Sequence, residues 1–369
     1  MTEPCKSQIL AEAQRLRACF EAAGATPVDA DILLPAETLL DLYGEDIRAR
    51  AYVTMDPLHG ELMMRPDFTV PVVQAHMSNG AGTARYTYLG EVFRKQEGDY
   101  DRANEYLQVG FELFDAEAPE KADAEVYALF ATLLADLPLR AATGDVGILR
   151  AAISGLKLSA PRRAALMRHL WRPRRFRTLL ERFSGRTPAT PQRVTLLEAH
   201  ARGEDVLSRA GMFIGLRDPD EIRKRLDRLA DDLSEPPLTE GELASLDQVI
   251  TLKDMSPAAL ERLSDIAVDM PAMHDAVQRF ERRLDALQAR GVDIDHLPFE
   301  AEFGRTTMEY YDGFVFGFSG TEQPGLPPVA LGGRYDALTR ILGQGTAMPA
   351  VGGMIRPASL LDLRSGDPA

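Results

Sequence analysis

The stretch ARYTYLGEVFRKQEGDYDRANEYLQVGFELFD, residues 84–115, decides the fold because it predicts two long strands joined by a charged loop. The second strand alternates strictly, and its apolar set faces one side: Leu107, Val109, Phe111 and Leu113. The opposite face presents Gln108 and Glu112 with Gly110 between them. The missing side chain at Gly110 predicts an empty place where a ligand could lie.

Arg94 ends the first of these two strands and would stand beside Gln108 and Glu112 if the strands pair antiparallel. An arginine, an amide and a carboxylate match the two charged ends of a free amino acid. An ordinary exposed hairpin with scattered polar residues would have the same composition. The stretch alone leaves both interpretations open.

Bulk composition excludes several classes of protein. The chain has 369 residues, enough for one large domain with a smaller one or for two medium domains. Its net charge of −14 argues against nucleic acid or an anionic membrane as the main partner. Two cysteines and six scattered histidines show no metal-ligand spacing, and no glycine-rich phosphate motif occurs, so we expect no metal and no cofactor. No apolar run approaches a membrane span and residues 1–10 do not resemble a signal peptide, which predicts a cytoplasmic protein.

Several elements are expected before and after the central hairpin. Residues 7–23 predict a first helix capped by Ser7, and residues 52–64 predict a short hairpin. Asp67 or Thr69 is placed to cap a helix with Pro71 in its first turn. Residues 120–137 predict an amphipathic helix ended by Pro138.

The sequence pattern changes at about residue 158, where strand signals almost vanish and prolines interrupt a helical periodicity. We therefore expect residues 158–290 to be a mostly helical insertion between two parts of a core, residues 1–157 and 291–369. Nine arginines occur between Arg162 and Arg186 against one acid, Glu181. Either a solvated helix face or a docking surface for an acidic partner or RNA would have this composition.

Strand signals return near Phe299. One strand places three aromatic residues on one face and glycine gaps on the other: Phe314, Phe316 and Phe318. The pairs Gly332-Gly333 and Gly352-Gly353 are expected to form turns that precede helices.

In this order, five segments resemble motifs of class II histidyl-tRNA synthetases. They are RPDFT (65–69), GEVFRK (90–95), QVGFE (108–112), EYYDGFVF (309–316) and GGRYDAL (332–338). The resemblance implies an α+β fold, with an antiparallel sheet of about six strands flanked by helices. It also implies a dimer formed through the first helix and the segment around Pro35.

The resemblance further implies an L-histidine pocket. Asp67 and Gln108 would meet the ammonium group, Arg94 the carboxylate, and Glu112 an imidazole N–H. Tyr311 and Tyr335 would line the slot of the ring, although plain core packing is the alternative for the tyrosines. The complete set of candidate histidine-binding residues is Asp67, Thr69, Arg94, Gln108, Glu112, Tyr310, Tyr311 and Tyr335.

The chain departs from the synthetase pattern where ATP chemistry needs charge. Gln96 replaces a glutamate, and Asn104 replaces one of two loop arginines, the other being Arg102. Thr306 falls on the arginine that activates the carboxylate, with Arg305 one residue away, while Ile355 precedes a retained Arg356. These substitutions lead us to expect no catalytic residues, and because only 13 residues follow Arg356 we expect no anticodon-binding domain.

A retained amino-acid pocket without catalytic groups resembles the regulatory subunits of ATP phosphoribosyltransferase. That family relation implies a non-catalytic subunit of histidine biosynthesis, paired with a short-form catalytic subunit in a hetero-octamer of four copies each. It also implies L-histidine as an effector, bound in the pocket or at the subunit interface. The alternatives are a truncated histidine-adenylate-forming enzyme and an RNA-binding synthetase paralogue.

Overall fold

A nine-stranded sheet forms the centre of the computed structural model, which describes residues 5–43, 47–80, 82–96, 103–208, 218–305, 310–321 and 327–365. Six strands in its middle pair antiparallel throughout. In spatial order they are β5 (Ala84–Phe93), β6 (Glu105–Phe114), β12 (Ala350–Ile355), β11 (Ala330–Arg334), β10 (Phe314–Gly320) and β7 (Leu139–Asp145).

The expectation of about six strands was wrong, because three short strands extend the sheet at its edges. They are β1 (Thr26–Pro27) beside β5, and β9 (Pro298–Glu300) and β8 (Lys253–Met255) beyond β7. The β1–β5 and β7–β9 pairings are parallel, so the sheet is mixed. Edge strands of two or three residues carry no periodicity that a sequence could display.

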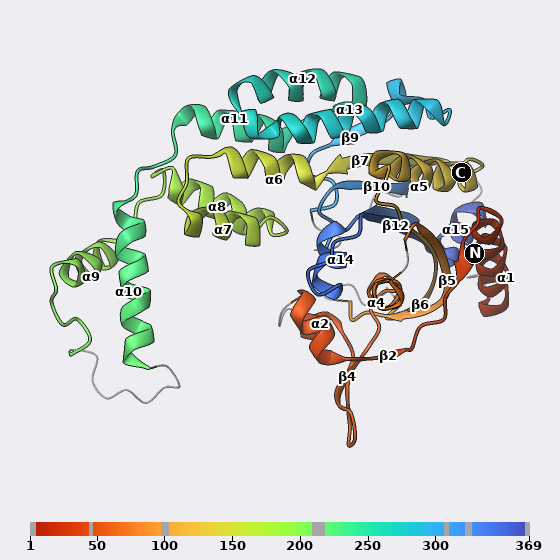
Figure 1. Cartoon of the computed structure of the whole chain (residues 1–369), viewed down its shortest axis with the longest axis horizontal. Coiled ribbons are helices and arrows are strands. Elements are labelled where there is room, and N and C mark those ends of the chain that lie inside the picture. Colours follow the sequence, from red (N-terminus) through yellow and green to blue (C-terminus); the bar gives the residue numbers. More distant parts are fainter. Residues whose placement is uncertain are drawn as a thin grey trace.

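The central hairpin is confirmed, with β5 and β6 paired along their whole length. Gly90 lies opposite Gln108, and Tyr88 lies opposite Gly110. Helices α1 (Lys6–Ala22) and α5 (Pro119–Leu133) cover the apolar face, where the ring centroids of Phe20 and Phe111 are 5.6 Å apart. Figure 1 shows these two helices outside the curved sheet and α4 (Thr69–Asn79) inside the curve. The polar face of β6 therefore looks toward α4.

A second, three-stranded sheet follows the order β2 (Leu33–Pro35), β4 (Gly60–Met64) and β3 (Val53–Asp56). The β3–β4 pairing confirms the hairpin expected over residues 52–64. Short helices α2 (Ala36–Tyr43) and α3 (Ile47–Arg50) accompany this sheet.

Helices occupy most of residues 146–289. They are α6 (Val146–Gly155), α7 (Ala160–Arg168), α8 (Pro173–Phe183), α9 (Pro191–Ala201), α10 (Pro219–Ser234), α11 (Glu240–Thr251), α12 (Ser256–Asp269) and α13 (His274–Ala289). In Figure 1, α7–α10 extend away from the sheet, whereas α13 packs along α5. The division into residues 1–157, 158–290 and 291–369 remains our interpretation. Among the described helices, none is long and apolar enough to cross a bilayer.

Three local predictions were wrong. The first helix begins at Lys6, with Cys5 rather than Ser7 at its N-cap, and α5 ends at Leu133, before Pro138 is reached. The Gly332-Gly333 and Gly352-Gly353 pairs lie inside β11 and β12 and face each other across that pairing. They precede helices α14 (Asp336–Leu342) and α15 (Pro357–Ser365), as expected.

These glycines make room for side chains that cross the sheet. A Cβ at Gly352 would lie 1.5 Å from Oε2 of Glu112, and one at Gly332 would lie 2.3 Å from the ring of Phe316. Steric exclusion by neighbouring strands, rather than a turn conformation, accounts for both pairs.

Candidate functional site

A cavity of about 510 Å³ lies over the polar face of the β5–β6 hairpin. Six of the eight predicted site residues line it: Asp67, Thr69, Arg94, Gln108, Tyr310 and Tyr311. They come from the start of α4, the end of β5, the middle of β6 and the segment before β10. The fold therefore gathers at one cavity residues that are far apart in the chain.

The space above Gly110 is not empty, contrary to the sequence prediction. A Cβ at Gly110 would lie 2.2 Å from the hydroxyl of Tyr88, whose ring fills that place. Tyr88 also lines the cavity and stacks on Phe68 with ring centroids 4.4 Å apart. Sequence reasoning missed Tyr88, although its position opposite Gly110 in an antiparallel register could have revealed it.

Glu112 and Tyr335, the other two predicted residues, lie behind the cavity wall rather than on it. The Thr69 hydroxyl donates to Oε1 of Glu112 at 2.9 Å, and the Tyr335 hydroxyl donates to Oε2 at 2.6 Å. Thr69 also accepts a hydrogen bond of 3.3 Å from Tyr310. Thr69 is thus the link between the cavity and the buried carboxyl group.

Glu112 is a buried acid held by two neutral hydroxyls. Only 1% of its surface is exposed. Burial raises the pKa of Glu112 to about 8, and the nearby charge of Asp67 acts in the same direction, while the two hydroxyl bonds oppose it. The carboxyl group is therefore largely protonated at neutral pH, and it would ionise readily if a cation approached.

Gln108 lines the cavity and carries a buried amide donor without an acceptor among the described residues. The residue is 1% exposed, and no described group accepts a bond from its Nε2. A buried donor without an acceptor costs about 1–3 kcal/mol, so the amide is a position where a ligand oxygen would be favourable.

Asp67 and Arg94 bring opposite charges to the same cavity. Arg94 donates from Nε to the Pro66 carbonyl at 2.7 Å, which fixes the guanidinium beside the segment that carries Asp67. Asp67 is 4% exposed, and its Oδ1 accepts a bond from the Val70 amide at 3.4 Å. One cation and one anion on one wall suit a zwitterion.

The loop side of the cavity carries less charge than the synthetase pattern, because Gln96 and Asn104 are neutral. Gln96 lines it, and its side chain donates to the Ala103 carbonyl at 3.4 Å. The Asn104 side chain accepts a hydrogen bond of 3.1 Å from the backbone N–H of Gln96 and so supports the loop. Arg356 also lines the cavity, with its guanidinium 5.8 Å from the Tyr106 ring centroid. Thr306 and Arg102 lie outside the described residues.

Arg305 is turned away from the cavity. It is 2% exposed, donates from Nε to the Leu170 carbonyl at 3.0 Å and lies 5.0 Å from the centroid of the Phe176 ring. Both contacts belong to the α7–α8 region, so this guanidinium does not line the cavity. Ile355 is fully buried, as an apolar residue at that position should be.

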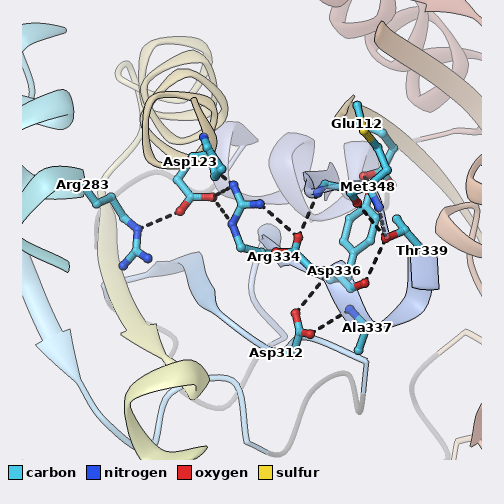
Figure 2. A network of polar contacts seen from close by, with 12 residues as sticks. Glu112, Asp123, Arg283, Asp312, Arg334, Asp336, Ala337, Thr339 and Met348 are labelled. Atoms are coloured by element: carbon cyan, nitrogen blue, oxygen red, sulfur yellow. Dashed lines mark hydrogen bonds and ion pairs between the residues drawn. The ribbon is translucent and has the colours of Figure 1, made fainter. Parts of the chain in front are cut away.

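A buried ion network behind the site escaped the sequence prediction. Arg283 of α13 donates to Asp123 of α5 at 2.8 Å and forms an ion pair with Asp145 at 2.8 Å. Arg334 of β11 donates to the other oxygen of Asp123 at 2.7 Å (Figure 2). Because Tyr335 follows Arg334, the network holds the tyrosine that donates to Glu112. No local spacing in the sequence brings these residues together.

The network continues at Asp312, which accepts bonds from the Asp336 and Ala337 amides at 2.9 and 2.8 Å (Figure 2). Burial raises the pKa of Asp312 to about 6, and the charge of Asp336 adds to the rise. Asp312 directly follows Tyr310 and Tyr311, so it anchors the segment that closes one wall of the cavity.

Comparison with known proteins agrees with this architecture. A family model described as histidyl-tRNA synthetase matches residues 4–242 and 233–360. An "ATP phosphoribosyltransferase regulatory subunit" of Mesorhizobium japonicum is 33% identical over 368 residues, covering 94% of this chain and 95% of that protein. Relatives of the same name from Allorhizobium ampelinum and Brucella ovis are 33% and 31% identical, and the alignments cover 92% and 93% of them.

Solved structures share the fold. A Bacillus halodurans structure titled ATP phosphoribosyltransferase regulatory subunit/histidyl-tRNA synthetase superposes with a TM-score of 0.69 at 20% identity, covering 99% of this chain and 82% of that one. The histidyl-tRNA synthetase of Nostoc sp. PCC 7120 gives 0.63 at 16% identity, covering 99% and 73%. Fold, near-complete coverage and identity above 30% lead to one conclusion: the chain belongs to the family of ATP phosphoribosyltransferase regulatory subunits, within the histidyl-tRNA synthetase superfamily.

Proposed function

We propose that this chain is the non-catalytic regulatory subunit of a cytoplasmic ATP phosphoribosyltransferase and that L-histidine is its inhibitory effector. Its partner would be a short-form catalytic subunit, which condenses ATP with phosphoribosyl pyrophosphate, in an assembly of four copies of each chain. The names of the relatives support the subunit assignment. The observation that carries the effector proposal is the cavity with Asp67, Arg94 and the unpaired Gln108 amide on its wall.

The cavity has the chemistry that an amino acid needs. Arg94 would meet the carboxylate and Asp67 the ammonium group, while the Gln108 amide would gain an acceptor. Tyr310 and Tyr311 would enclose the side chain. Glu112 would act through Thr69, or directly after a shift of that hydroxyl, by accepting the proton or hydrogen bond of an imidazole N–H.

The same cavity is poorly equipped to adenylate an amino acid. That reaction needs cationic groups around the phosphates of ATP, and Gln96 and Asn104 are neutral. Arg305, whose position is nearest to the activating arginine of the synthetase pattern, bonds to Leu170 instead. These features favour a site that recognises histidine without reacting it.

Co-expression with the short-form catalytic subunit of the same organism tests the proposal. We expect the two chains to co-purify, the complex to form phosphoribosyl-ATP faster than the catalytic subunit alone, and histidine to lower that rate. Failure to associate would contradict the subunit assignment. Histidine-dependent exchange of pyrophosphate into ATP by the purified chain would instead identify an adenylate-forming enzyme.

A further inference from the structure

Seven of the nine arginines in the arginine-rich run fall into two structural groups. The first group forms ion pairs within the helical region. Arg162 is buried and pairs with Asp232 and Glu235, while Arg182 and Arg186 pair with Asp232 and Glu240, respectively. These contacts join α7 and α8 to α10, and the residues after α8 to the start of α11. They account for those arginines as structural residues.

Four other arginines remain exposed on α7 and α8, and we call them the basic face: Arg168, Arg174, Arg175 and Arg177. In the described part of the chain, no acidic side chain forms an ion pair with any of them. Burial lowers the pKa of His169, and the charges of Arg175 and Arg168 lower it further, which places both cations close to that ring.

The basic face is unfavourable for the isolated chain. Arg174 and Arg175 lie in the first turn of α8, where the helix dipole disfavours positive charge. Arg174 and Arg177 are spaced i, i+3 on α8, and the charges of Arg168 and Arg175 both act on His169, so like charges also repel each other. Exposed arginines that destabilise the isolated chain are expected where an anionic partner surface neutralises them on binding.

Trp171 lies within the same region, in the turn between α7 and α8, and is half-buried. It is the single tryptophan of the sequence. Tryptophan and arginine are the residues most enriched among those that dominate protein–protein binding energy, so the composition matches an interface.

The α7–α8 turn also contacts Arg305, which lies close in sequence to the cavity-lining residue Tyr310. Leu170, in the same turn, accepts the hydrogen bond from Arg305, and Phe176 of α8 packs on that guanidinium. Arg305 lies five residues before Tyr310, which lines the cavity.

We propose that the basic face of α7–α8 is a docking surface for an acidic patch on a protein partner. Resting on the proposed function, that partner is the catalytic subunit. Arginine binds carboxylates through two parallel hydrogen bonds, and an acidic patch suits the exposed guanidinium groups that α7 and α8 carry. A long polyanion such as RNA would meet the repulsion of a chain whose net charge is −14, so a protein surface is favoured.

Charge reversal tests the docking surface in the intact complex. Arg174→Glu/Arg175→Glu should weaken association with the catalytic subunit at least about tenfold, and wild-type association should fall as salt increases. Arg174→Lys/Arg175→Lys should lose less, because lysine keeps the charge but not the paired geometry. The matched control is Arg279→Glu/Arg340→Glu, which makes the same charge change at exposed arginines of α13 and α14 and should leave association unchanged.

The outcomes separate this proposal from the proposed function. Unchanged association of Arg174→Glu/Arg175→Glu, or equal loss in the control, would overturn the docking surface while leaving the subunit assignment intact. Loss of salt-sensitive tRNA binding without loss of the complex would assign the face to RNA and overturn it as well. Absence of any complex with the wild-type chain would overturn both.

Discussion

Replacing Glu112 by glutamine should stabilise the fold at high pH, because it removes a buried charge. The carboxyl group is 1% exposed, and among the described residues it receives hydrogen bonds from two hydroxyls, those of Thr69 and Tyr335. Its pKa is about 8 in the folded protein and 4.5 as the ordinary value. A difference of roughly 3.5 units corresponds to about 5 kcal/mol.

The sign of the effect follows from proton binding. Between the two pKa values the folded chain holds the Glu112 proton more tightly than the unfolded chain does. The wild-type free energy of unfolding therefore falls as pH rises through this window, and the full penalty is reached above about pH 8. Glutamine has no such penalty, although one hydroxyl must turn to accept from its amide, at a cost of about 1 kcal/mol.

We therefore expect Glu112→Gln to exceed the wild type in stability by about 4 kcal/mol near pH 8.5 and to differ by about 1 kcal/mol or less near pH 5. Denaturant unfolding of both proteins at the two pH values measures this. Subtracting the variant–wild-type difference in unfolding free energy at pH 5 from that at pH 8.5 cancels the contributions of other titrating groups. Glu261→Gln, at an exposed position on α12, is the control and should show no such pH dependence. A Glu112→Gln effect that is the same at both pH values would refute the argument.

Three further predictions concern the site and its support. Gln108→Ala should weaken histidine binding about tenfold by calorimetry, because the unpaired amide is the donor that a ligand would satisfy, and unchanged affinity would disprove that role. Arg283→Met should lower the free energy of unfolding by about 3–5 kcal/mol because Asp145 and one oxygen of Asp123 lose their buried cation, whereas Arg282→Met, at an exposed pair, should cost about 1 kcal/mol or less. Gly352→Ala should be strongly destabilising because its Cβ would overlap Glu112, while Gly82→Ala meets open space; equal melting temperatures would argue against the crossing of Glu112 over β12.

The sequence predicted the central hairpin well because alternation along β6 is a local signal. The same alternation placed Gln108 and Glu112 on one face, and six of the eight candidate residues do line one cavity. The alternation could not show which residues of that face reach the cavity. Glu112 lies on the same face of β6 as Gln108 but is separated from the cavity by Thr69, because neighbouring strands and α4 decide which side chains line it.

Other errors have the same origin in long-range packing. Gly352 was predicted to form a turn, yet it is glycine because the Glu112 side chain crosses a neighbouring strand. Gly110 predicted an empty place, but Tyr88 from the paired strand fills it. The Arg283–Asp123–Arg334 network joins residues more than 150 positions apart, which no motif spacing could reveal.

The central claim is that histidine binds the cavity above the β5–β6 hairpin and thereby inhibits the partner. The most direct test measures phosphoribosyl-ATP formation against histidine concentration in complexes that contain wild-type chain or Asp67→Asn. Loss of a charged hydrogen bond of about 1.5–3 kcal/mol predicts a half-inhibitory concentration raised about tenfold or more. Superimposable inhibition curves would contradict the claim and move the effector site away from this cavity.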